Sequence, residues 1–542
     1  MISNPFSRKN NVSEAAEQPL ALPLESEPRF TFCASVKPAK VKQWFDDLPI
    51  TDYQLVATKL YSALPELCRV KLNNTARVEI LEHVRPLVLN CVSAITAPLT
   101  KKPLALSEKE KKTALVAQAL LKHLALAYCR LGVNSLADKK LNAASKASYF
   151  QRPLVILSLL LKNNVQLYTP VPNYFWHLTN GVFQLANKQE LHNVNVTDAF
   201  NSNYAGTCNH SYITILALTV ARPLQLRPSE IEQLFSVLSA WAKQLTLAPY
   251  TADSNALFAV IGDSDHEPDY LDSFESHQLQ ASGMVFDFRT LLQQLDKVIK
   301  QTGPDKGPVA INLHQHLALN WGTRVRRKNQ RIACHTELEI CIGISAIHDQ
   351  LAKGANFDEF VTGSSHKAGF MLSTEWDDKP SPEPPDIPIG SSAQTHRLTA
   401  INSGQKGFQL ICQDKAPRKL QAGELIGFRE PGKRNWQLAV VRWVKRSEKT
   451  GIQFGVMMIG RRLEAYGAST ETESGHDSDY LRVLLVKEGS EDGKTSLVTP
   501  NSVFNERYPV ILKKRGESTR VHISKRLSSS ASYCQYRYST TS

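Results

Sequence analysis

The sequence lacks a long apolar run. None of its hydrophobic segments approaches the roughly 20 residues that cross a bilayer as a helix. The first residues also lack the continuous apolar core of a secretory signal, and they soon become acidic and proline-bearing. We therefore expect a cytoplasmic protein with no membrane span.

Cysteine is scarce and scattered. The nine cysteines are odd in number and form no CxxC pair, so neither a disulfide framework nor a thiolate zinc site is indicated. His314 and His316 are the only closely spaced histidines, and no carboxylate or cysteine stands at ligand spacing from them. We predict no metal site.

Catalytic and nucleic-acid-binding motifs are missing as well. There is no P-loop, GxSxG, HExxH or Rossmann fingerprint, and no nucleophile–base pair can be assembled, so we predict neither enzymatic activity nor a cofactor. RNP, helix-turn-helix, KH and zinc-finger patterns are absent too. The formal net charge of +13 suggests an anionic partner, but nucleic acid is a disfavoured one.

What is present is a long globular chain whose first half has the periodicity of helices. At 542 residues it exceeds one ordinary core, and two to four domains are expected. Tyr53, Val56 and Leu60 recur at helical steps, and Ser107 with Glu110 forms a capping box. Helix follows helix to about residue 250, which indicates an α-helical bundle or solenoid. Such a scaffold either binds a protein partner or only supports the neighbouring domain, and the sequence leaves both roles open.

Four local predictions concern single helices in this half. A helix that opens near Asn74 should kink or end at Pro86. Ser229 should cap another helix, with Glu232 closing the box. Residues 147–162 and 173–191 should add further helices.

The second half has the pattern of β structure. After Arg331 the apolar residues alternate, and several short strands separated by glycine turns predict a small antiparallel barrel. The fold class is therefore multidomain α + β, a helical domain followed by a barrel and a smaller β unit. The predicted parts are a disordered tail 1–28, a helical domain 29–318, a barrel 319–465 with a proline-rich insertion 364–395, a linker 466–480 and a C-terminal β unit 481–542.

A basic stretch lies at the joint between the two halves. It contains Arg324, Arg326, Arg327, Lys328 and Arg331. Arginine clusters can hold anionic ligands, because the planar guanidinium fork matches a phosphate or a guanine edge. The alternative is an ordinary solvated basic loop.

The motifs around this joint resemble those of the PilZ domain, a bacterial sensor of cyclic di-GMP. Arg327-Lys-Asn-Gln-Arg331 matches the family's RxxxR element, which precedes its first strand. Asn402-Ser-Gly404-Gln-Lys-Gly407 matches the [DN]xSxxG element, with glycine in place of the serine. Ala439-Val-Val-Arg-Trp443 and Gly451-Ile-Gln-Phe-Gly455 are similar to a strand pair of the family. An N-terminal helical part is found in one proteobacterial group of these proteins.

The resemblance implies cyclic di-GMP as the ligand and assigns its contacts. Arg327 and Arg331 would grip phosphates and guanines, and Arg326 or Arg324 would meet the extra charge of a dimeric ligand. Of these two we prefer Arg326, and we expect Arg324 and Lys328 to be bystanders. Asn402 would bind a guanine edge.

The two glycines of the second motif also receive expectations. Gly407 would let the backbone approach the ligand closely, and Gly404 would lose a hydroxyl contact of about 1 kcal/mol. A purely structural explanation of Asn402, Gly404 and Gly407 is a tight strand turn that needs left-handed backbone conformations. Trp443 is expected in the barrel core rather than as a stacking platform.

The resulting functional hypothesis is a non-enzymatic cyclic di-GMP receptor. Ligand binding at the helical–barrel joint would alter a protein-binding surface of the helical domain. Two alternatives stay open: a degenerate PilZ-like adaptor that assembles proteins without the nucleotide, and a nucleic-acid-binding protein.

Overall fold

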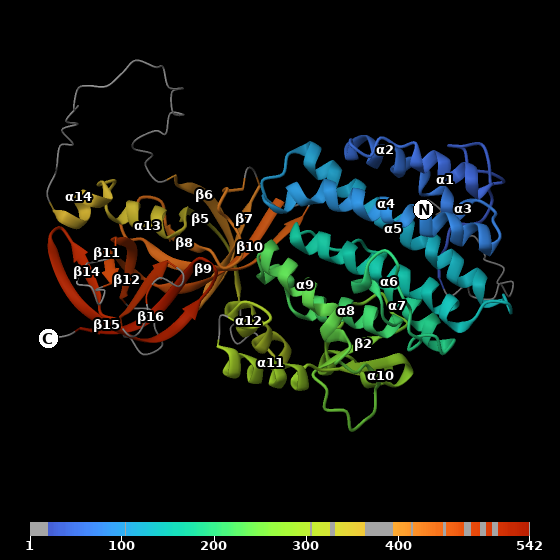
Figure 1. Cartoon of the computed structure of the whole chain (residues 1–542). Helices are drawn as coiled ribbons and strands as arrows, with labels where there is room; N and C mark the ends of the chain where they lie inside the picture. The colour runs from blue at the N-terminus through green and yellow to red at the C-terminus, as the bar shows by residue number, and fades with distance from the viewer. Residues whose placement is uncertain are drawn as a thin grey trace, which may run out of the picture.

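The computed structural model describes residues 20–102, 104–303, 306–325, 331–363, 394–413, 416–447, 451–470, 479–487, 495–500, 504 and 508–540. These residues form a helical half and two β-barrels, and the first barrel lies between the helical half and the second barrel (Figure 1). The multidomain α + β prediction is confirmed.

The helical half is built from nine helices among the residues described. Asp52, Asn73, Ser107, Asn142 and Thr207 cap five of them by accepting backbone N–H groups, as short polar side chains do at helix starts. The bounds are α1 (Pro38–Asp46), α2 (Tyr53–Ala63), α3 (Glu66–Arg69), α4 (Asn74–Thr100), α5 (Glu108–Leu136), α6 (Ala143–Gln166), α7 (Phe175–Lys188), α8 (Cys208–Val220) and α9 (Pro228–Ala242), with short 3-10 turns η1 (Ser202–Tyr204) and η2 (Pro223–Gln225).

Some local helix predictions are confirmed and others are wrong. The capping box of Ser107 and Glu110 is present. Helix α4 runs through Pro86 to Thr100, so this proline does not end it, because a continuous buried face holds the helix against its neighbours. Helix α9 starts earlier than predicted: the Glu230 carboxylate accepts the Arg227 N–H at 2.8 Å, and Ser229 is not the cap.

The structure qualifies two expectations from the sequence: the lack of any helix long and apolar enough to span a membrane, and the disorder of residues 1–28. Helix α5 is long and apolar enough to cross a membrane by length and composition, yet most of its apolar window is buried inside the helical half. The predicted tail 1–28 is ordered from residue 20 onward: Leu20 is 2% exposed, and Glu25 pairs with buried Arg77 at 2.5 Å. Residues 1–19 lie outside the described part.

A small mixed unit follows the helices and was not predicted. Its four strands are β1 (Ala248–Pro249), β2 (Phe258–Ile261), β3 (Asp269–Tyr270) and β4 (Gly283–Phe286), in the order β1-β4-β2-β3. The turn η3 (Leu271–Ser273) and the helices α10 (Ser276–Ser282), α11 (Arg289–Thr302) and α12 (Ile311–Gly322) complete it. Two of these strands have only two residues, too few to show a two-residue alternation.

The first barrel is closed, with the strand order β10-β7-β6-β5-β8-β9. Alternate apolar side chains fill its interior, and Ile340, Leu410 and Phe454 are fully buried there. The elements are β5 (Ile332–Ile342), α13 (Ile344–Leu351), α14 (Phe357–Thr362), β6 (His396–Gly404), β7 (Gly407–Cys412), β8 (Leu425–Arg429), β9 (Gln437–Ser447) and β10 (Gly451–Gly460). Most of the predicted insertion, 364–393, lies outside the described residues.

The second barrel is also closed, with the order β11-β12-β13-β16-β15-β14. Numbered from its own first strand, each barrel reads 1-2-3-6-5-4, so the two share one topology. Residues 466–470 of the predicted linker belong to its first strand, and residues 471–478 lie outside the described part. The strands are β11 (Arg462–Thr470), β12 (Leu481–Lys487), β13 (Ser496–Pro500), β14 (Val510–Lys514), β15 (Glu517–Ser529) and β16 (Tyr533–Thr540).

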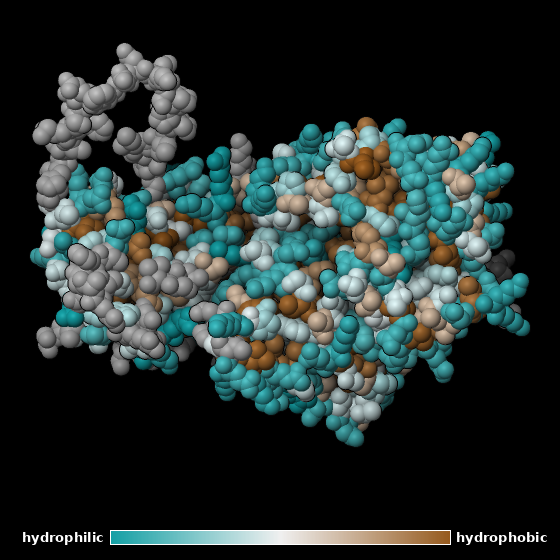
Figure 2. All heavy atoms as spheres, viewed as in Figure 1, coloured by the Kyte–Doolittle hydropathy of each residue, from teal (hydrophilic) through white to brown (hydrophobic). Residues whose placement is uncertain are grey.

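The three parts pack directly on one another. Tyr168 of the helical half is fully buried against the core of the first barrel, and its carbonyl accepts the Arg446 N–H at 2.7 Å. Arg227 donates to the Ala422 carbonyl at 3.1 Å and pairs with Glu424 at 3.3 Å. The surface is mostly hydrophilic, with separate hydrophobic patches over the helical half (Figure 2).

Candidate functional site

The two sequence motifs meet at the start of the first barrel. Arg331 stands directly before β5, and its Nη1 donates to Asn402 Oδ1 on β6 at 3.1 Å. The register places Asn402 opposite Ala333, two residues beyond Arg331. Two positions 71 residues apart in the chain are thereby brought into one contact.

A row of carboxamides continues from Asn402 across the sheet. Asn402 Nδ2 donates to Gln409 Oε1 on β7 at 2.6 Å, and Gln409 Nε2 donates to Gln453 Oε1 on β10 at 3.1 Å. Phe408 and Leu410, the neighbours of Gln409, point into the barrel core, so Gln409 faces outward. The row therefore lies on the outer face of the barrel.

A cation stands at the far end of this row. Lys445 on β9 is directly opposite Gln453 and is exposed. Burial raises the pKa of Glu267, in the loop between β2 and β3, and the nearby cations Arg222 and Lys445 act to lower it. Arg331 and Lys445 thus place positive charge at both ends of a polar row.

Trp443 lies beside the row rather than in the barrel core, so that expectation was wrong. It is half-buried and stands opposite Gly455, which itself stands opposite Gln409. A Cβ added at Gly455 would be 2.1 Å from the Trp443 Nε1, which shows that the indole covers the glycine. A β-bulge next to Gly455 shifts the alternation, because Val441 and Val444 both face inward.

The second motif forms the hairpin between β6 and β7. Gly404 pairs with Gly407 across a two-residue turn. Neither glycine has a positive φ, so the left-handed conformation expected there is not used. A Cβ at Gly407 would be 2.0 Å from the Val456 carbonyl oxygen, so the close approach of β10 requires glycine.

The rest of the basic stretch is only partly described. Arg326, Arg327 and Lys328 lie outside the described residues. Arg324 forms an ion pair with Asp272, and its guanidinium lies 5.5 Å from the centre of the Tyr270 ring. Because this cation already has an acidic partner, it is a poor candidate for the extra ligand charge.

The sequence did not predict that Gln409, Gln453 and Lys445 form a row with Asn402, or that Trp443 faces outward. The alternation Phe408-Gln409-Leu410 contained a usable indication, since a polar residue between two buried ones marks the outer face. Nothing local indicated that the three strands carrying these residues are neighbours.

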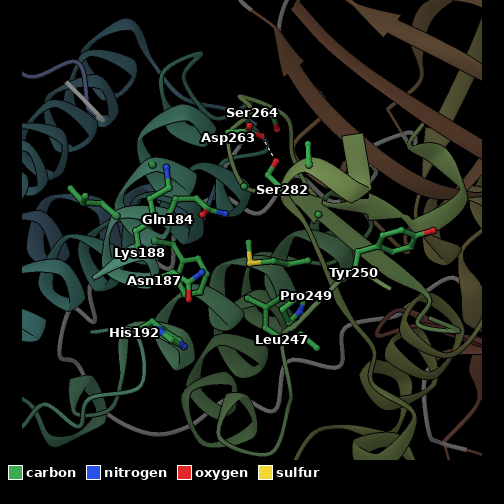
Figure 3. A pocket seen from close by; sticks show the side chains of 18 of the residues that line it. Gln184, Asn187, Lys188, His192, Leu247, Pro249, Tyr250, Asp263, Ser264 and Ser282 are labelled. Atoms are coloured by element: carbon green, nitrogen blue, oxygen red, sulfur yellow. Dashed lines mark hydrogen bonds between the residues drawn. The ribbon is translucent and has the colours of Figure 1, made fainter. Parts of the chain in front are cut away.

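A separate cavity lies in the helical half and the small mixed unit. Its volume is about 620 Å³, and its described lining residues fall between positions 177 and 284. Gln184 and Lys188 of α7 lie on one side of it and Tyr250 on the other, and Asp263 accepts a hydrogen bond from Ser282 (Figure 3). Within the described residues, no group of three His, Cys, Asp or Glu side chains can hold a metal ion.

Comparisons with known proteins match every part of this architecture. Family models for the cyclic-di-GMP receptor FimW match its N-terminal domain to residues 39–252, its middle PilZ domain to 257–384 and 388–463, and its C-terminal β-barrel domain to 466–541. The middle match begins before β2, well ahead of the barrel start predicted at 319.

One curated relative is similar over nearly its whole length. The cyclic-di-GMP receptor FimW of Pseudomonas aeruginosa is 27% identical over 569 aligned residues, which cover 96% of this chain and 93% of the relative. No solved structure matches the chain significantly.

Proposed function

We propose, from the premise that this chain belongs to the three-domain FimW family with a central PilZ domain, that it is a non-enzymatic cytoplasmic receptor for cyclic di-GMP. The observation that carries the proposal is the hydrogen bond between Arg331 and Asn402. It joins the arginine element to the strand-turn element on one outward face of the barrel.

The face offers the chemistry that the ligand requires. Cyclic di-GMP carries two phosphates and two guanines. Arg331 at one end of the row and Lys445 at the other supply cations for the phosphates, and the guanidinium can grip a phosphate through two N–H groups. Arg327 and Arg326, which precede Arg331, are proposed as further phosphate and guanine contacts.

The carboxamides and the indole suit the bases. Asn402, Gln409 and Gln453 each present both a donor and acceptors, as a guanine edge demands. The half-buried Trp443 offers a flat apolar surface beside them, which supports base stacking. We propose that Gly404 and Gly407, which have no side chain, let the ligand approach the hairpin backbone closely. For Gly407 this is in addition to its packing role.

A protein partner of the helical half is proposed as the output of the receptor. Tyr168 and Arg227 tie the helical half to the barrel, so a change at the barrel face can alter the geometry of the helices. The alternative of an adaptor that works without the nucleotide rests on Gly404, which replaces the hydroxyl of the family motif.

Calorimetric titration of the full chain with cyclic di-GMP tests the proposal. We expect binding for the unaltered protein and a large loss for Arg327→Ala/Arg331→Ala. No measurable heat at tens of micromolar protein would reject the receptor function. Intact binding in the double variant would reject the site instead, and unchanged cellular function of that variant would favour the adaptor.

A further inference from the structure

The β-bulge in β9 turns two neighbouring side chains to the outer face of the first barrel. Val441 and Val444 both point into the barrel core, although a regular strand would place only one of them there. The register shift falls between the partners of Val441 and Trp443, and it leaves Arg442 without a direct partner on β10. Arg442 is exposed and Trp443 is half-buried, so both side chains lie on the outer side of the sheet.

Arg442 therefore extends the outward-facing polar row at its β9 end. Asn402, Gln409 and Trp443 lie in one line across β6, β7, β10 and β9, with a glycine on β10 between the last two. Because neighbouring strands lie about 4.8 Å apart, the four steps from β5 to β9 separate the Arg331 and Arg442 ends by roughly 19 Å at most. A ligand that lies along the row meets a guanidinium at each end.

Arg442 also borders a cavity where the helical half and the two barrels meet. This cavity has a volume of about 240 Å³. Its described lining comes from α9 and α12, from β9 and the residues just before β8, and from the hairpin of β15 and β16. Arg442 thus stands between the polar row and a junction that all three parts share.

No acidic group at this junction is paired with Arg442. Its side chain forms no ion pair or hydrogen bond within the described part of the chain. Glu230, the one carboxylate in the described lining, accepts hydrogen bonds from Asn312 at 2.6 Å and from the Arg227 N–H at 2.8 Å. Burial lowers the pKa of His316, also in the lining, to about 4, so this ring is neutral near pH 7. The Arg442 guanidinium can therefore accept an anion from outside the protein.

We propose that Arg442 is a phosphate-binding residue of the nucleotide site, an inference that rests on the proposed function. A cyclic di-GMP molecule that lies along the row places one phosphate at the β9 end, where the guanidinium donates two N–H groups to it. Trp443 stands next to Arg442 in the chain and carries the adjacent guanine. The nucleotide then reaches the edge of the junction cavity.

This position brings the nucleotide close to the second barrel. Ser529 and Ala531, in the hairpin of β15 and β16, line the same cavity as Arg442. A nucleotide held by Arg442 lies against this cavity and limits the access of water to it. Amide exchange in the peptide 528–533 should therefore slow when cyclic di-GMP binds.

Two substitutions separate the charge of Arg442 from its geometry. In calorimetric titration, Arg442→Ala should bind cyclic di-GMP about 10- to 30-fold more weakly, because the phosphate contact is lost. Arg442→Lys keeps the charge but not the two-pronged grip, and we expect a loss of about 3- to 5-fold. As salt rises, the affinity of Arg442→Ala should fall less steeply than that of the unaltered protein, since one cation fewer meets the ligand.

Arg434→Ala is the matched control. Arg434 is an exposed cation in the loop between β8 and β9 of the same barrel. The same net charge is lost, and both the affinity and its salt dependence should stay unchanged. Thermal unfolding of every variant shows whether the fold is intact. At saturating cyclic di-GMP, the slowing of exchange in the peptide 528–533 should be smaller in Arg442→Ala than in the unaltered protein.

The outcomes distinguish the two proposals. If the unaltered protein does not bind cyclic di-GMP, the proposed function fails and this inference fails with it. If the unaltered protein binds and Arg442→Ala binds equally well, only the role of Arg442 is overturned. Equal losses in Arg442→Ala and Arg434→Ala would also overturn it, because the effect would then be one of net charge. Unchanged exchange in the peptide 528–533 would overturn the placement of the nucleotide beside the cavity.

Discussion

The two barrels have the same strand order, but their corresponding outer faces differ in polarity. In the first barrel, β6, β7 and β10 present polar Asn402, Gln409 and Gln453. The corresponding strands of the second barrel are β12, β13 and β16. Their outer face is apolar and buried against the first barrel, through the side chains of Leu484, Val486, Val498 and Tyr533.

This difference separates fold from function. One face of a shared topology is left polar and accessible, whereas its counterpart is used to join the two barrels. The barrel topology alone therefore says nothing about ligand binding, which depends on the side chains of a single face. We expect one nucleotide site per chain, on the first barrel.

The largest expected effect is on ligand binding, which should depend on the first barrel and not on the second. Arg331 stands directly before the first strand of its barrel, and Arg461 stands directly before β11, the first strand of the other. Arg331→Ala should weaken cyclic di-GMP binding about 100-fold, because charge-assisted hydrogen bonds to a phosphate are lost. Arg461→Ala should leave calorimetric binding unchanged, and a comparable loss there would break the comparison.

The second effect concerns stability. Leu484 is fully buried between the barrels, so Leu484→Ala should lower the free energy of unfolding by about 3 kcal/mol. Gln409→Ala on the matching face of the first barrel should cost about 1 kcal/mol or less, since it removes hydrogen bonds at a half-buried position. Denaturant unfolding measures both, and a reversed ranking would contradict the assignment of the faces.

The third effect is a pH dependence of the junction between the barrels. Burial, with nearby Arg482, lowers the pKa of His348 to about 4, and the ring is 1% exposed beside Phe360. The unfolded chain takes up the proton near pH 6.5, so stability is full above that pH. It should fall by up to about 3 kcal/mol as the pH drops to about 4.

His348→Phe tests this assignment, because the variant cannot take up the proton. Its free energy of unfolding, measured from about pH 7 to about pH 4, should fall less steeply than that of the unaltered protein. His316→Gln is the comparison. Burial also lowers the pKa of His316 to about 4, but this residue lies on α12 and not between the two barrels. If the free energy of unfolding has the same slope against pH in the unaltered protein and in His348→Phe, protonation of His348 does not cause the pH dependence.

The smallest effect sharpens the role of Trp443. Gly455→Ala forces the indole away from its present position, and we expect binding to weaken about 10-fold, in line with the loss of one stacked base. Trp443→Ala should cause a similar loss. The double variant should be no weaker than Trp443→Ala alone, and additive losses in titration would show that the glycine acts by another route.

Much of the fold was predictable because it follows local patterns. Helical periodicity and the Ser107 box placed helices in the first half, and alternation placed strands after Arg331. The four-stranded sheet was missed because β1 and β3 have two residues each. The limits of the linker were wrong because β11 follows β10 almost without a joint.

Part of the site was predictable for a different reason. Arg331 and Asn402 belong to motifs of a known family, so both were assigned to the ligand without knowledge of the fold, but their direct contact was not predicted. Trp443 was misplaced because a β-bulge reverses the alternation, and a bulge has no dependable sequence pattern. The partner of Arg324 was not predicted, because Asp272 is distant in the chain and belongs to a unit that was not predicted.

The basic stretch shows which features the sequence determines and which depend on the tertiary structure. The sequence alone determined that five cations cluster at the joint of a helical and a β half, with the spacing of a known nucleotide-binding element. Only the tertiary structure decided which partners they meet: Asn402 for Arg331, and Asp272 with Tyr270 for Arg324. Such contacts depend on strand order and register, which join residues that are distant in the chain.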